Sequence, residues 1–287
     1  MSKANKSPRP PHHRDEKMAK QDKAIEESLS RIKHKFLVMS GKGGVGKTSV
    51  ATNLAVSLSR KGTKVGLMDV DLHGPDIPRM LGLPGIVDLD ADGRLVPKPY
   101  SENLEMVSIE SMTEKVDEAV IWRGPLKMHA IRQFLYGVWW GRLDYLVIDS
   151  PPGTGDEPLT IAQTIPDAKA IIVTTPQEIS LADVRKAINF CTVVEMTIFG
   201  LIENMSGFVC PHCGKHTELF GAGGGYRTAI DMNIPFLAQI PFDPRMVRCA
   251  DTGKAYVEKY PNSEVTIAFN QVIDKILGEE QTKTAAA

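Results

Sequence analysis

The segment from residue 41 to residue 48 reads GKGGVGKT and has the spacing of a phosphate-binding loop. It matches G-x-x-x-x-G-K-[ST] and lies between an apolar run and a helical pattern, a context that disfavours a chance glycine-rich turn. Its glycines let backbone N–H groups face phosphate oxygens, Lys47 is expected to reach the β- and γ-phosphates, and Thr48 is expected to ligate Mg2+. The predicted nucleotide contacts in this loop are Gly41, Lys42, Gly43, Gly44, Val45, Gly46, Lys47, Thr48 and Ser49.

Three aspartates stand where apolar runs end. Asp149 closes LDYLVIDS, the placement of a carboxylate that holds Mg2+ through water. Asp69 and Asp71 in VGLMDVDLHGP are two residues apart, so an extended chain places both on one side. One of them could orient or deprotonate an attacking water while the other supports the metal. The alternatives are a helix-cap or turn residue for Asp149 and two solvated acids for the pair.

Cys210 and Cys213 lie in FVCPHCGKH, which has the shape of a metal-binding turn. A tetrahedral thiolate site needs four ligands, so this pair supplies half of one, and the other half must come from this chain or from a second copy. Zinc, an iron–sulfur cluster and a redox dithiol all remain open, although a redox motif usually opens a helix. The further candidates are His212, His216, Cys249 and Cys191, of which Cys191 is expected to be an inert core thiol.

These residues must be positioned by an alternation of strands and helices. Short runs rich in Val, Ile and Leu predict strands over 35–40, 64–71, 104–109, 143–150, 168–175, 197–206 and 236–241, with helices from 47, near 125–139 and from 180. Continuous apolar strands indicate burial on both faces. The predicted fold class is therefore α/β, a mostly parallel twisted sheet with helices on both faces, in which the candidate residues gather at the carboxyl edge. The Gly/Pro-rich stretch 83–100 predicts an excursion with a hairpin.

Length and charge set the domain limits. The 287 residues, 42% of them apolar, predict one ATPase domain over 34–278, preceded by a flexible basic tail over 1–33 and followed by a disordered tail over 279–287. Residues 1–35 carry ten Lys and Arg against five Asp and Glu, and a short surface helix is predicted within 18–33. A nucleic-acid contact by this tail is the less favoured alternative. Without a membrane span or signal peptide, a cytoplasmic protein that binds neither nucleic acid nor membrane is expected.

Several longer motifs resemble a known group. GKGGVGKT, with its additional lysine, resembles the deviant Walker A loop of the MinD/ParA/Mrp class of P-loop ATPases. The chain is further similar to the Mrp/ApbC-type iron–sulfur cluster carrier ATPases in DVDLHGPDIPRMLG, IDSPPGTGDEPLT, TTPQEISLADVRKAI, IENMSGFVCPHCG, FGAGGG and IPFDP. The similarity spans roughly residues 35–277, and the conjunction of motifs is more specific than any single one.

The resemblance implies roles for individual residues. Lys42 is expected to reach across a homodimer to the nucleotide of the other subunit, which explains a second lysine in the loop and resembles the action of an arginine finger. Asp71 is expected to position the attacking water, Gly153 to approach the γ-phosphate and Asn204 to read the adenine.

The resemblance also implies a cargo. Cys210 and Cys213 from each of two subunits are expected to bridge one [4Fe-4S] cluster, which a homodimeric, ATP- and Mg2+-dependent ATPase passes to apo-proteins that are its clients. Two alternatives remain open. A MinD/ParA-like positioning ATPase is expected to show a membrane helix or a basic face, which the C-terminal sequence AFNQVIDKILGEEQTKTAAA does not provide. An NTPase with a structural zinc would use the same cysteines.

Overall fold

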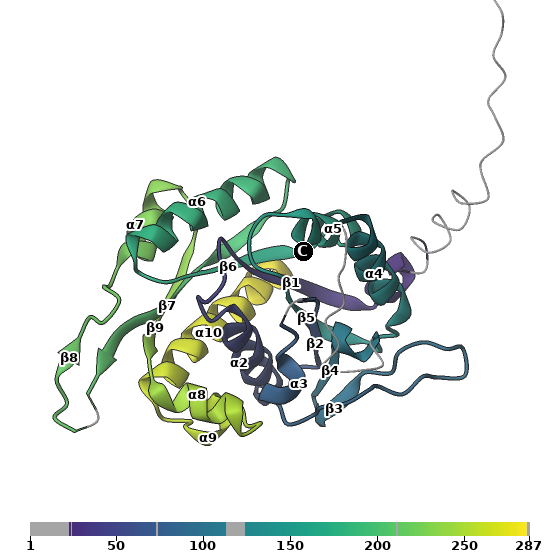
Figure 1. The fold of residues 1–287 in the computed structure, drawn as a ribbon, viewed down its shortest axis with the longest axis horizontal. Coiled ribbons are helices and arrows are strands. Elements are labelled where there is room, and N and C mark those ends of the chain that lie inside the picture. Colours follow the sequence, from purple (N-terminus) through teal and green to yellow (C-terminus); the bar gives the residue numbers. More distant parts are fainter. Residues whose placement is uncertain (1–22, 24, 73, 113–123, 211, 286–287) are drawn as a thin grey trace, which may run out of the picture.

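The computed structural model describes residues 23, 25–72, 74–112, 124–210 and 212–285. In this part of the chain a single sheet of nine strands has the order β3-β4-β2-β5-β1-β6-β7-β8, and β9 also pairs with β7 (Figure 1). The strands are β1 (Ile32–Ser40), β2 (Val65–Asp69), β3 (Lys98–Ser101), β4 (Leu104–Ser108), β5 (Leu143–Asp149), β6 (Lys169–Thr174), β7 (Ile198–Val209), β8 (His216–Thr217) and β9 (Phe236–Phe242). All pairings are parallel except those of β3 with β4 and of β8 with β7. The predicted α/β class is therefore confirmed.

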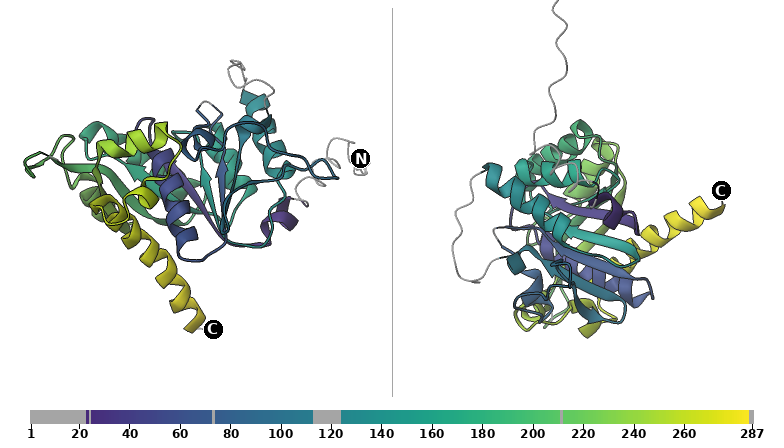
Figure 2. Two further views of the ribbon diagram at one scale, coloured as in Figure 1. Left: turned by 90° about the horizontal axis from the view of Figure 1, so that it is seen from below. Right: turned by 90° about the vertical axis from the view of Figure 1, so that its right-hand side faces the viewer.

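Helices cover both faces of this sheet (Figures 1 and 2). The helices are α2 (Lys47–Arg60), α3 (Ile77–Met80), α4 (Gly124–Gly137), α5 (Asp156–Thr164), α6 (Glu178–Val193), α7 (Gly224–Asp231), α8 (Pro244–Asp251), α9 (Tyr256–Lys259) and α10 (Glu264–Ala285), with a 3-10 turn over Ile109–Met112. Residues of α2, α3, α8, α9 and α10 form one buried core, whereas residues of α4, α5, α6 and α7 form the other.

The central strand β1 shows why the sheet is buried on both sides. Phe36 and Val38 point into the core with α2 and α10, and Leu37 and Met39 point into the core with α4, α5 and α6. Each of these side chains is at most 2% exposed. Alternate residues of an apolar run thus serve two different cores, which is what a run without polar alternation predicts.

The ordered fold extends beyond both predicted boundaries of the domain. Residues 25–29 are helical, and Ile25 and Leu29 pack into the core that also holds Ile32, so this part of the predicted tail is not a solvated surface segment. At the other end α10 continues as a helix to Ala285, where a disordered tail was predicted, because no helix-breaking residue interrupts it after Gly278. The first part of the helix predicted over 18–33, and most of the predicted tail, lie outside the described residues.

The predicted excursion is a hairpin-like extension. Leu89 and Leu95 form an isolated antiparallel bridge within it, and β3 then runs antiparallel to β4 at the edge of the sheet. Arg94 from this extension and Arg31 both lie over the ring of Trp139, with their Cζ atoms 4.0 and 4.1 Å from its centroid. Among the described residues, no helix is long and apolar enough to cross a membrane.

Candidate functional site

The loop between β1 and α2 turns sharply at two glycines. Gly44 and Gly46 both have φ of 78°, in the left-handed region that favours glycine. A Cβ atom at Gly46 would lie 2.4 Å from Nδ2 of Asn204, so this position also needs glycine for space. Gly41 packs equally closely on the backbone of α6, where a Cβ atom would lie 2.2 Å from the carbonyl oxygen of Asp183. The loop conformation is therefore fixed at both ends by contacts that exclude side chains.

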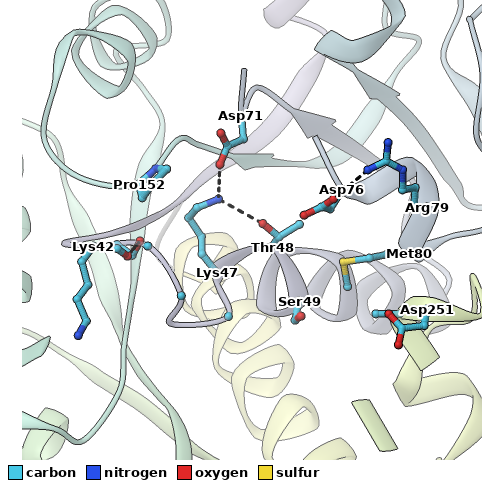
Figure 3. A pocket seen from close by; sticks show the side chains of 15 residues that line it. Lys42, Lys47, Thr48, Ser49, Asp71, Asp76, Arg79, Met80, Pro152 and Asp251 are labelled. Carbon is cyan, nitrogen blue, oxygen red and sulfur yellow. Dashed lines mark hydrogen bonds and ion pairs between the residues drawn. The ribbon is translucent and has the colours of Figure 1, made fainter. Parts of the chain in front are cut away.

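Lys47, at the start of α2, is the central cation of the site. Its Nζ donates to Oδ1 of Asp149 at 2.7 Å. It also forms an ion pair with Oδ2 of Asp71 at 3.8 Å (Figure 3). The neighbouring Thr48 donates from Oγ1 to Oδ2 of Asp149 at 2.7 Å. The structure thus brings together four of the residues predicted from three separate motifs, because β1, β2 and β5 are neighbours whose carboxyl ends meet at one edge.

Two of the carboxylates are completely buried and adjacent. Asp69 and Asp149 are paired in the register of β2 and β5, and both are 0% exposed. Burial and the charge of Asp149 raise the pKa of Asp69 well above its ordinary value, and burial raises the pKa of Asp149 against the opposing effect of Lys47. Such a pair of buried acids favours a bound cation nearby.

The spacing of Asp69 and Asp71 predicted that both lie on one side of an extended strand, but the structure differs. The strand β2 ends at Asp69, so alternation does not continue to Asp71, whose backbone N–H donates to Asp69 Oδ1 at 3.2 Å. The other oxygen of Asp69 accepts from the N–H of Ile77 and the hydroxyl of Ser108, each at 3.3 Å. Asp69 therefore anchors the start of α3 beneath the surface, while Asp71 lines the cavity.

A cavity of about 580 Å³ opens above the loop. Figure 3 shows the side chain of Lys42 extending away from Lys47. The lining residues are Ser40, Lys42, Gly43, Gly44, Gly46, Lys47, Thr48, Ser49, Asp71, Asp76, Arg79, Met80, Pro152, Ala250 and Asp251. Of these, Asp76, Arg79, Met80, Ser40, Pro152, Ala250 and Asp251 were not predicted as site residues. The motif DVDLHGPDIPRMLG contains the first three, but no spacing rule separates lining residues from neighbours within it.

Six residues predicted to contact the nucleotide do not line this cavity: Gly41, Val45, Asp69, Asp149, Gly153 and Asn204. Val45 is buried, and its carbonyl accepts from Nδ2 of Asn204 at 2.9 Å, so this amide holds the loop in the structure. Gly153 has φ of 90°, and its N–H donates to the carbonyl of Ser40 at 2.9 Å. The turn after β5 is thereby tied to the end of β1, and its neighbour Pro152 reaches the cavity.

Cys210 and Cys213 lie on a tight turn between β7 and β8. Gly214 N–H donates to the carbonyl of Cys210 at 2.9 Å, and Cys210 N–H donates to the carbonyl of Lys215 at 3.0 Å. The backbone N–H groups of Cys213 and His212, followed by the Cys213 side chain, lower the pKa of the Cys210 thiol. Cys210 is partly exposed and Cys213 is exposed, at the end of a hairpin that projects from the molecule (Figure 2, left).

Of the remaining cysteine and histidine candidates, His212 lies within this turn, whereas Cys191, Cys249 and His216 lie outside it. Cys191 is fully buried, and burial raises the pKa of its thiol to about 12, so the expected inert core thiol is confirmed. Cys249 is 1% exposed in the core beside α10. His216 stacks over Gly207, where a Cβ atom would lie 2.6 Å from its Nε2. Among the described residues, no three His, Cys, Asp or Glu side chains are arranged to hold a metal ion.

The donor set at the loop fits a magnesium nucleotide. Thr48 Oγ1 and Asp149 Oδ2 are hard oxygen donors of the kind that Mg2+ prefers. Close contacts leave no room for a side chain at Gly41 or Gly46, and the helix α2 begins directly after the loop, so its N-terminal N–H groups face the cavity. Strand order, loop and carboxylates together define a P-loop nucleotide-binding domain of the MinD/ParA type.

A family model described as "ParA: NUBPL iron-transfer P-loop NTPase" matches residues 31–277. The chain belongs to this family of P-loop NTPases.

Relatives of similar length support this assignment. The chain is 45% identical over 267 residues to an "Iron-sulfur cluster carrier protein" of Methanocaldococcus jannaschii, covering 92% of each chain. It is 47% identical over 266 residues to the "Cytosolic Fe-S cluster assembly factor CFD1" of Kluyveromyces lactis, covering 88% of this chain and 94% of the relative. To the human "Cytosolic Fe-S cluster assembly factor NUBP2" it is 42% identical over 255 residues, covering 87% and 94%.

Solved structures agree on the fold. A nucleotide-binding protein from Archaeoglobus fulgidus in complex with ADP superposes with a TM-score of 0.71 at 40% identity, covering 82% of this chain and 92% of that one. The cell division ATPase MinD of Pyrococcus furiosus superposes with a TM-score of 0.66 at 22% identity, covering 85% and 98%. The second likeness concerns the fold alone.

Proposed function

We propose that this chain is a homodimeric, cytoplasmic ATPase that holds a [4Fe-4S] cluster between two copies and transfers it to apo-proteins. The cluster is cargo, and ATP with Mg2+ is the substrate that controls it. The names of the relatives, an iron–sulfur cluster carrier and two cytosolic assembly factors, support this assignment.

The nucleotide part of the proposal depends on Lys47, Thr48 and Asp149. Lys47 contacts the phosphates of ATP, and Thr48 and Asp149 hold Mg2+, which supplies positive charge to neutralise the phosphate oxygens. Asp71 already lines the cavity 3.8 Å from Lys47, and it positions the attacking water. Gly41, Gly43, Gly44, Val45, Gly46, Ser49, Asp69, Gly153 and Asn204 shape and support the binding site.

Lys42 acts in trans. Its side chain extends away from Lys47 of its own chain, as expected of a cation that serves a nucleotide on a facing copy (Figure 3). A cation delivered to the transferring phosphoryl group lowers the barrier by stabilising its negative charge. Hydrolysis then requires two chains that face each other.

The observation that carries the cluster proposal is the projecting turn with two accessible thiols. Its backbone N–H groups favour the thiolate of Cys210, which is the form that binds metal. One turn supplies two thiolates, and an iron–sulfur cubane has four such ligands, so two facing copies complete the set. A cluster held at an interface by exposed turns is accessible to an acceptor protein.

Anaerobic reconstitution with iron and sulfide tests this proposal. We expect a [4Fe-4S] chromophore and Mössbauer signature with four irons per two chains, lost in Cys210→Ser and Cys213→Ser. Cys249→Ala is the matched control, because Cys249 is buried away from the turn. Iron retained by the Cys210 variant contradicts the proposal. Zinc instead of iron under these conditions, with unfolding of the Cys210 variant, favours a structural zinc site.

A further inference from the structure

The strand β7 runs from the nucleotide loop to the cysteine turn. Asn204 on this strand donates to the carbonyl of Val45, and Cys210 follows the last residue of the same strand, Val209. Figure 1 shows β7 extending from the body of the sheet towards the hairpin with β8. Any movement of the nucleotide loop that shifts Asn204 can therefore be transmitted to the thiols along a few residues of the same strand.

This route contains an irregularity. Between Asn204 and Phe208 the strand advances four residues while its partner β9 advances two, from Ile240 to Phe242. Met205 and Gly207 have positive φ values of 57° and 78° within this interval. A bulge bends a strand and re-aims the residues that follow it, so residues 205–207 set the direction of the cysteine turn.

Glu203, immediately before this bulge, is a buried carboxylate with four donors. Its Oε1 accepts from Gly223 N–H at 2.8 Å, from Gln239 Nε2 at 3.1 Å and from the hydroxyl of Ser206, and its Oε2 accepts from Gly225 N–H. Glu203 is 0% exposed. A carboxylate is buried at low cost only when its oxygens are satisfied in this way.

The glycine-rich stretch FGAGGG provides two of these donors at the start of α7. Gly223 has φ of 77°, and a Cβ atom at Gly225 would lie 2.9 Å from Oε2 of Glu203. The helix N-terminus carries partial positive charge, which stabilises the carboxylate. The stretch therefore allows α7 to clamp Glu203, while Ser206 ties the bulge to the same carboxylate.

We infer that Glu203 is a positioning residue, which couples the nucleotide loop to the cysteine turn by holding the bulge of β7 against the start of α7. Because Glu203 holds the bulge against the start of α7, the two move together. A shift at Asn204 therefore moves the cysteine turn as a rigid unit and is not absorbed by local changes at Met205 and Gly207. This inference rests on the nucleotide binding proposed above and names the contact through which it acts on the thiols.

A matched pair of substitutions isolates this contact. Ser206→Ala and Gln239→Met each remove one donor to the same oxygen of Glu203, but only Ser206 lies on the bulge. Glu203→Gln is the stronger change, because its amide group would place N–H donors against the N–H of Gly225. Should this variant fail to fold, the matched pair still decides the question.

The readout is the rate at which iodoacetamide alkylates Cys210 and Cys213 in metal-free protein, measured with and without a non-hydrolysable ATP analogue. We expect the analogue to change this rate about fivefold or more in the wild type and in Gln239→Met, and to leave it unchanged in Ser206→Ala. Affinity for the analogue should be equal in all three proteins.

Retention of the nucleotide effect in Ser206→Ala overturns the inference, as does its equal loss in Gln239→Met or its absence from the wild type. Iron content is measured separately. If the coupling is present but no cluster can be assembled, the proposed cargo is wrong and the coupling stands. If the wild type binds no analogue, both proposals fail.

Discussion

Lys47 is neutralised by carboxylates before any phosphate reaches it. Its side chain is 6% exposed, and its ammonium group lies between Asp149 and Asp71, at 2.7 and 3.8 Å. A triphosphate must compete with these two carboxylates for Lys47, and Asp149 then needs another partner for its charge. In the nucleotide-free protein, the contact with Lys47 keeps the buried cation and the buried acid paired.

Asp69 predicts an unusual dependence of stability on pH. Because burial raises its pKa, folding favours the protonated acid, whose contribution to stability is present below the ordinary value of 3.8 and is lost as pH rises through the raised pKa. In metal-free protein we expect Asp69→Asn to raise the melting temperature at pH 8 by about 2 °C or more, with a smaller difference at pH 4. Calorimetry at both values checks this. A variant less stable than the wild type at pH 8 contradicts the pKa direction.

Lys42 predicts a separation of binding from hydrolysis. If it serves the nucleotide of a facing copy, Lys42→Ala should lower kcat about 100-fold or more, as the loss of a charge-stabilising finger does, while ADP affinity stays within about twofold. Steady-state ATPase assays and calorimetric titration measure the two quantities. Lys186→Ala, on the exposed surface of α6, is the control. Equal losses of affinity and kcat would place Lys42 in the site of its own chain.

At the scale of elements, the phosphate-binding loop packs closely on β7 where Gly46 meets the side chain of Asn204. Gly44 and Gly46 share φ of 78°, but a Cβ atom meets nothing within 4 Å at Gly44 and lies 2.4 Å from Asn204 Nδ2 at Gly46. Gly44→Ala should cost about 1–2 kcal/mol of stability for its backbone alone. Gly46→Ala should cost about 1–3 kcal/mol more, because Asn204 is buried and bonded to Val45. If urea unfolding gave the same loss of stability for Gly44→Ala and Gly46→Ala, Asn204 would be able to move aside without cost, which contradicts this prediction.

The elements and the loop were predictable because both depend on local pattern. Apolar runs predict strands buried on two faces, and the fixed spacing of Gly46, Lys47 and Thr48 places them at the start of α2. The meeting of Lys47 with Asp149 follows from parallel strand order, which the alternation of strands and helices also predicts.

Three features could not be predicted because they depend on contacts between residues that are distant in sequence, which no local sequence pattern indicates. Glu203 is indistinguishable in sequence from an exposed acid, and its partners Gly223 and Gly225 are 20 and 22 residues away. The packing of Ile25 on the core was missed because the surrounding segment is polar and charged. The end of β2 at Asp69 was missed because strand boundaries depend on pairing with β4 and β5.

At the scale of the whole molecule, both proposed functions require a second copy of the chain. The side chain of Lys42 extends away from Lys47 of its own chain (Figure 3), and the projecting cysteine turn would supply two of the four thiolates of the proposed cubane (Figure 2). A facing copy would complete both. The oligomeric state of the protein is therefore a stronger test of both proposals than any single residue.

Native mass spectrometry of the anaerobically reconstituted protein in the presence of ATP and Mg2+ tests this most directly. The expected species is a dimer, with twice the 31.5 kDa of one chain, that carries one [4Fe-4S] cluster. A single chain that carries both nucleotide and a complete cluster would contradict the account.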